Sequence, residues 1–100
     1  MTLQTNTENG KITIKAQGWL DTQSAPLLGE KFDEITQADE IVLDFEELEY
    51  ISSSGLRMVV AGFKKAKELN AKFKVINAGN EVMDVFKLTN LDKKIDISVK

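Results

Sequence analysis

The sequence contains no histidine and no cysteine, and it has a single proline among its 100 residues. Without histidine, the chain lacks the commonest general base and the commonest metal ligand of proteins, which excludes most hydrolase mechanisms. Without cysteine, it can form neither a disulfide bond nor a thiolate metal site, so its stability must come from packing. We therefore expect no metal site and no cofactor.

Long apolar runs are absent as well. No stretch approaches the roughly eighteen apolar residues of a membrane-spanning helix, and the N-terminal MTLQTNTENG has neither the basic start nor the apolar run of a signal peptide. The net charge of −3 argues against binding to nucleic acid or anionic lipid. We expect a cytoplasmic protein, monomeric when free, with neither nucleic acid nor a membrane as a partner.

The hydrophobic pattern predicts the elements of one domain. With 42% hydrophobic and 29% charged residues, residues 1–100 have the size and composition of a single globular domain. Two alternating runs meet at Asn9 and Gly10, which predicts an antiparallel hairpin whose second strand ends at Gly18. Further strands are predicted at about 40–45, 72–77 and 94–99, and helices at about 22–37, 54–69 and 80–88.

The order of these segments, ββαβαβαβ, predicts an α/β domain. Its sheet should be mixed and mostly parallel, with the N-terminal antiparallel hairpin at one edge and helices packed on it. The nearly continuous apolar run EIVLDF is typical of a strand covered on both faces. The expected helix caps are Asp21, Thr22 or Ser24, followed by Pro26 in the first turn, and Asn80 for the third helix.

Three consecutive serines and a glycine, in YISSSGLRMVV, precede the second predicted helix. A serine nucleophile needs a base, and the chain offers no histidine, no SxxK and no G-x-S-x-G pattern there. The GK[ST] and spaced glycines of phosphate-binding loops are missing too. A cap explains Ser53 or Ser54 but not all the serines. Phosphorylation is the remaining option, because a phosphate at a helix N-terminus meets the positive end of the helix dipole.

The second helix has an unusual face opposite its predicted core residues. The core face comprises Leu56, Val59, Val60, Phe63 and Ala66. The opposite face, which should meet water, comprises Ser54, Met58, Ala61, Gly62 and Lys65. Small and apolar residues are uncommon on a solvated face, so this strip is either a docking surface for a partner or a strip covered by another part of the chain.

Three segments of this sequence resemble the STAS domain of anti-sigma factor antagonists. They are GWLDTQSAPLLGEKF, LDFEELEYISSSGLRMVVAGFKKAKELNAKFKVIN and VFKLTNLDKKIDI, which together cover nearly the whole chain. The resemblance implies a binding protein, not an enzyme. Its partner would be an anti-sigma factor of histidine-kinase-like ATPase fold that phosphorylates a serine and so blocks binding, and a serine phosphatase would reverse the block.

The resemblance also assigns roles to individual residues. Ser53 matches the phosphoacceptor, and Ser52, standing where the family usually has aspartate, is a second candidate. Arg57 stands where a second glycine is common and can pair with a phosphate or a partner's carboxylate. The expected partner-binding residues are Asp21, Thr22, Ser52, Ser54, Gly55, Arg57, Met58, Ala61, Gly62 and Lys65. The alternative is a STAS module that is never phosphorylated and belongs to a larger signalling or lipid-transport assembly.

Overall fold

The chain begins with the predicted antiparallel hairpin. In the computed structural model, which describes residues 1–100, β1 (Thr2–Glu8) pairs with β2 (Lys11–Leu20) along its whole length. The turn residues Asn9 and Gly10 have φ angles of 50° and 81°, values that asparagine and glycine adopt readily. Gly18 does not end β2 as expected: with a φ of 93° it forms an irregularity in the pairing, and the strand continues to Leu20.

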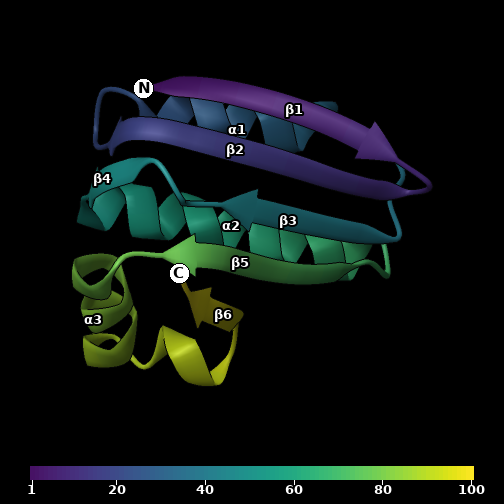
Figure 1. Ribbon diagram of the computed structural model, residues 1–100. Coiled ribbons are helices and arrows are strands. Elements are labelled where there is room, and N and C mark those ends of the chain that lie inside the picture. The colour runs from purple at the N-terminus through teal and green to yellow at the C-terminus, as the bar shows by residue number, and fades with distance from the viewer.

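Parallel strands extend the sheet from this hairpin. β3 (Glu40–Asp44) pairs with β2, β5 (Lys72–Ala78) with β3, and β6 (Asp96–Val99) with β5, all in parallel. The resulting order is β1-β2-β3-β5-β6, which Figure 1 shows from the side opposite α1 and α2. The predicted α/β class, with a mixed, mostly parallel sheet and an antiparallel hairpin, is confirmed.

A further short strand was not predicted. β4 (Leu48–Ile51) pairs in parallel with the last residues of β2, Gly18 to Leu20, beyond the end of β3. Only its first and last residues are buried, so the segment has none of the alternation that reveals a strand. The predicted order therefore lacked one strand, the one that leads directly into the serine turn.

The helices follow the prediction with corrections at their ends. α1 (Ala25–Glu34) is shorter than the predicted helix at both ends. α2 (Ser53–Glu68) matches closely and α3 (Asn80–Leu88) matches fully, with a short 3-10 turn (Leu91–Lys93) after it. Asn80 is not the cap of α3, because Gly79 occupies the N-cap position and no side chain bonds there. None of the helices is long and apolar enough to cross a membrane.

The helices cover one face of the sheet only. α1 and α2 lie behind it in Figure 1, and residues from all three helices share one hydrophobic cluster with Ile41 and Leu43 of β3. The expectation that β3 is covered on both faces by other elements is wrong. Val42 is buried to 1% exposure but lies outside this cluster. Its register neighbours on the flanking strands are Thr13 and Lys74, both half-buried.

Candidate functional site

The serine turn connects β4 to α2, and each of its serines has a different environment. Ser52 is the N-cap of α2, and its Oγ accepts a hydrogen bond from the Gly55 N–H at 3.2 Å. Its extended backbone, with φ −93° and ψ 175°, is the usual conformation of a capping residue. The expectation that Ser53 or Ser54 caps the helix is therefore wrong, because the helix begins one residue earlier than predicted.

Ser53 is the first residue of α2 and is exposed to solvent. The hydroxyls on either side of it are engaged: that of Ser52 caps the helix, and that of Ser54 lies 3.1 Å from Thr22 Oγ1. Ser53 makes no such contact, so it presents the most accessible hydroxyl of the turn. This arrangement suits a group that another protein must reach.

Gly55 is required by the close approach of β2 to the start of α2. A Cβ on Gly55 would lie 2.6 Å from the Leu20 carbonyl oxygen, a contact that no side chain tolerates. The same carbonyl accepts a hydrogen bond from the Ser52 N–H at 2.9 Å. The glycine of the turn thus fixes how closely the serines lie to the end of β2.

The loop before α1 lies against the serine turn through the contact of Thr22 with Ser54. Within this loop, Asp21 Oδ1 accepts hydrogen bonds from the N–H groups of Gln23 at 3.1 Å and Ser24 at 3.0 Å. Hydrogen bonds from the Ser24 backbone and hydroxyl hold the pKa of Asp21 below its usual value. Ser24 is the N-cap of α1, but its hydroxyl serves the loop, donating to the Trp19 carbonyl at 2.7 Å.

The strip predicted to face water on α2 is partly covered by α1. Gly62 is buried, and a Cβ there would lie 2.4 Å from Phe32 Cζ. Met58 is half-buried against Gly29. Gly62 is therefore excluded from any docking surface, and small residues occur here because two helices pack closely. Ala61 remains exposed, and with Lys65 it lines a groove of about 440 Å³ between α1 and α2.

Arg57 is exposed on α2 and lines a second groove, of about 400 Å³, between α2 and the segment after α3. The apolar wall of this groove comes from Leu56, Val60, Ala61 and Leu91. All the ion pairs of the structure involve lysines, so the Arg57 guanidinium has no carboxylate partner.

Trp19 and Tyr50 form an exposed aromatic pair that sequence reasoning missed. Their ring centroids lie 5.1 Å apart, and the side chains are 57% and 46% exposed. Trp19 is two residues before Asp21 of the loop that precedes α1, and Tyr50 is two residues before Ser52 of the serine turn. The aromatic pair therefore adjoins both segments of the site. Each aromatic residue directly precedes an apolar residue that is buried, Leu20 or Ile51. Neighbouring residues of a strand point to opposite faces, so this order was the signal in the sequence that the aromatic side chains are exposed.

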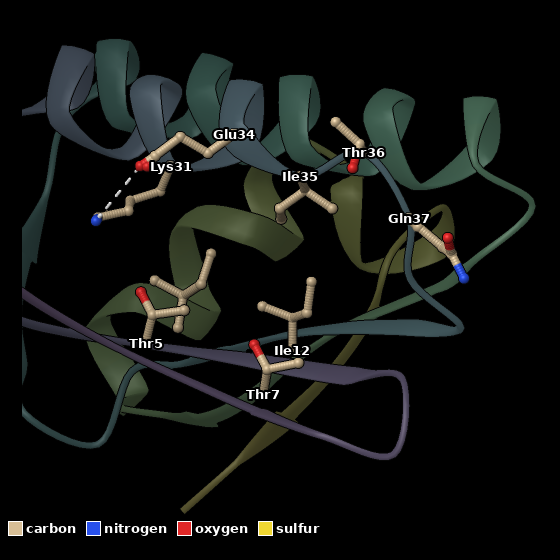
Figure 2. Close-up of a pocket in the computed structure, with 9 residues that line it drawn as sticks. Thr5, Thr7, Ile12, Lys31, Glu34, Ile35, Thr36 and Gln37 are labelled. Atoms are coloured by element: carbon tan, nitrogen blue, oxygen red, sulfur yellow. Dashed lines mark ion pairs between the residues drawn. The ribbon is translucent and has the colours of Figure 1, made fainter.

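A separate groove of about 270 Å³ lies at the other end of α1, between this helix and the hairpin. Figure 2 shows Thr5, Thr7 and Ile12 from the sheet facing Ile35, with the Lys31–Glu34 ion pair of 3.7 Å at one side. The helix side of the groove is formed by the last turn of α1 and the residues that follow it, Ile35, Thr36 and Gln37. It is separated from the serine turn by the length of α1.

The fold and the site together define a small α/β domain whose hydroxyl-rich turn, at the start of α2, lies against the loop that precedes α1. The chain belongs to the STAS domain family, whose sequence profile matches residues 2–100. It is 31% identical over 90 residues to the anti-sigma-B factor antagonist of Bacillus subtilis (strain 168), which covers 89% of this chain and 83% of that protein.

Solved structures share the fold. An anti-sigma factor antagonist from Mycobacterium paratuberculosis superposes with a TM-score of 0.88 at 23% identity, covering 99% of this chain and 86% of that one. The Bacillus cell fate determinant SpoIIAA in its phosphorylated form gives a TM-score of 0.77 at 17% identity, covering 99% and 93%. At these identities the structures establish the fold alone.

Proposed function

We propose that this protein is a cytoplasmic anti-sigma factor antagonist, a single-domain binding protein that is switched off by phosphorylation of Ser53. In its unmodified form it binds an anti-sigma factor of histidine-kinase-like ATPase fold, and the sigma factor is released. The observation that carries the proposal is the exposed Ser53 hydroxyl at the start of α2, between two serines whose hydroxyls are engaged. The names of the relatives support the same role.

The docking face of this proposal surrounds the serine turn. It joins the loop before α1 to the start of α2 and runs along the part of α2 that α1 leaves accessible. Its members are Asp21, Thr22, Ser52, Ser54, Arg57, Met58, Ala61 and Lys65. Gly55, which the resemblance also placed in the partner-binding set, is buried like Gly62 and is therefore not part of the surface. The hydrogen bond between Thr22 and Ser54 supports a single continuous surface, because it ties the two segments together.

Phosphorylation would act locally in this arrangement. A phosphate on Ser53 adds about two negative charges outside the core, and the positive end of the α2 dipole tolerates them. The Ser52 cap does not involve the Ser53 side chain, so α2 keeps its start. The added charge and volume then affect the docking partner and leave the fold unchanged.

The serine at position 52 is compatible with this switch. Aspartate and serine are both strong N-cap residues, since each side chain can accept a backbone hydrogen bond in the first helical turn. The capping contact with Gly55 supports this exchange of one residue for the other. Ser52 is correspondingly the weaker candidate acceptor, because phosphorylating it would replace the capping hydroxyl.

The substitution Ser53→Asp tests the proposal. We expect affinity for the anti-sigma factor to fall at least tenfold, measured by titration calorimetry with a candidate histidine-kinase-like ATPase from the same genome. The melting temperature should change little, because Ser53 is exposed. Ser98→Asp, at another exposed serine, is the matched control and should bind as the wild type. Equal affinity of the wild type and Ser53→Asp would contradict the switch.

Intact-mass spectrometry after incubation with ATP and the same kinase tests the acceptor. We expect one added phosphate in the wild type and in Ser52→Ala, and none in Ser53→Ala. A wild type that binds the kinase but gains no mass would instead indicate the constitutive module. A serine phosphatase should remove the phosphate and restore binding.

A further inference from the structure

Arg57 lies one helical turn after Ser53 on the same side of α2. Residues four apart on a helix are neighbours on its surface, and both side chains are exposed here. Helical side chains lean toward the N-terminus of their helix, so the long Arg57 side chain can reach the turn that carries Ser53.

The surroundings leave this arginine available. No carboxylate of the chain forms an ion pair with it. The next cations of α2, Lys64 and Lys65, stand 11 and 12 residues beyond Ser53, which is about 16 Å or more along the helix axis. Arg57 is therefore the one cation of α2 that can reach a phosphate on Ser53.

We propose that Arg57 is the intramolecular partner of the phosphate on Ser53. The inference rests on the proposed phosphorylation and specifies which residue of the protein binds the phosphate. A guanidinium can donate two parallel hydrogen bonds to phosphate oxygens, an arrangement that lysine cannot reproduce. The phosphate is then held along the α2 surface instead of extending freely into solvent.

This pairing gives the switch a second effect. In the unmodified protein, Arg57 borders the groove between α2 and the segment after α3 and is available to a carboxylate of the anti-sigma factor. Once paired with the phosphate, Arg57 is withdrawn from that groove and its charge is neutralised. Phosphorylation thus adds a negative group to the docking face and removes a positive one.

The test installs phosphoserine at position 53 during translation, so that no kinase is needed. Phosphorus NMR then follows the ionisation of the phosphate with pH. An adjacent cation stabilises the dianion, so we expect a second phosphate pKa at least about 0.3 unit lower in the wild type than in Arg57→Ala. Arg57→Lys should give an intermediate value.

Lys64→Ala is the matched control, because it removes the same charge from an exposed site on α2. It should leave the phosphate pKa at the wild-type value. Equal pKa values in the wild type and Arg57→Ala would overturn the pairing, and so would an equal rise in Lys64→Ala. Neither result depends on an anti-sigma factor, so the pairing can fail while the proposed function holds, and the reverse.

Discussion

At the residue scale, the three adjacent serines before α2 have three different roles. Ser52 caps the helix, Ser53 is exposed, and Ser54 contacts Thr22 of the neighbouring loop. Each task follows from the direction in which the backbone points successive side chains as it enters a helix. A stretch of three identical residues is therefore not redundant in the folded protein.

Replacing the capping serine should reduce stability. Ser52→Ala leaves the Gly55 N–H without its acceptor, and we expect the free energy of unfolding to fall by about 1 kcal/mol. Urea denaturation monitored by circular dichroism measures the change. Ser52→Asp should restore the stability, and Ser53→Ala should leave it unaltered. A loss in Ser53→Ala as large as that in Ser52→Ala would contradict the assignment of the cap.

Asp21 should contribute stability that depends on pH. Its folded pKa lies below its usual value because the Ser24 and Gln23 groups donate hydrogen bonds to the ionised carboxylate. The contribution is therefore present at pH values above the unfolded pKa and is lost as the pH falls through the lower folded pKa. Asp21→Asn retains an acceptor but no charge.

We expect Asp21→Asn to be less stable than the wild type near pH 7 and to approach it below about pH 4. Chemical denaturation at a series of pH values gives both curves. Asp33→Asn, at an exposed position on α1, is the matched control. A stability difference that stays constant from pH 7 to pH 3 would show that the charge of Asp21 plays no part.

At the element scale, the contact between α1 and α2 depends on glycine. The Phe32 ring of α1 occupies the space where a side chain at position 62 would stand, and Met58 of α2 fills the corresponding space at Gly29 of α1. Each helix thus places one large side chain against a glycine of the other helix. This packing explains Gly62 and Met58, two of the residues that resembled a docking strip, whereas Ala61 stays exposed.

Gly62→Ala should destabilise the protein although alanine favours helices. The helix propensity gains about 1 kcal/mol, but the added Cβ would lie 2.4 Å from the ring of the buried Phe32, which would have to move out of its packed position. Overpacking typically costs 1–3 kcal/mol, and we expect a lower melting temperature. Gly79→Ala, where no atom lies within 4 Å of the added Cβ, should melt close to the wild type. A Gly62→Ala variant more stable than the wild type would contradict the close contact.

At the scale of the whole molecule, one end of the sheet carries the proposed docking face. The start of α1, the end of β2, β4 and the start of α2 all meet there, as Figure 1 shows. Trp19 and Tyr50 stand beside this junction with nearly half or more of their surface exposed. The sole tryptophan of the chain is therefore placed to report on events at the serine turn.

Binding of the anti-sigma factor should change the fluorescence of Trp19. The exposed indole should emit at a wavelength typical of solvated tryptophan and should be quenched efficiently by acrylamide. We expect a blue shift and weaker quenching on complex formation, measured with a partner whose tryptophans are replaced. Trp19→Phe should abolish the signal, and Ser53→Asp should require more partner to produce it. Unchanged emission at saturating partner would place the docking face elsewhere.

The predictions made from the sequence were correct where the spacing of apolar residues reflects which face of an element is buried. Alternation identified β2, and helical spacing identified α2 closely, because burial of one face imposes those periods. β1 is exposed except at Leu3, and the Asn9-Gly10 turn that joins it to β2 was the stronger signal. β4 was missed because its two buried residues are separated by two exposed ones. The exposed aromatic pair was missed because composition does not distinguish a core tryptophan from a surface one.

The sequence by itself determined the class of fold, the family and the position of the serine turn, since these depend on local patterns and on residues adjacent in the chain. Only the tertiary structure decided which serine caps α2, which side of that helix is covered, and which residues surround the turn. These depend on Leu20, Thr22 and Phe32, which lie 30 or more residues from their partners in the chain. Contacts over such separations arise from the packing of β2 and α1 against α2, and no local sequence pattern predicts them.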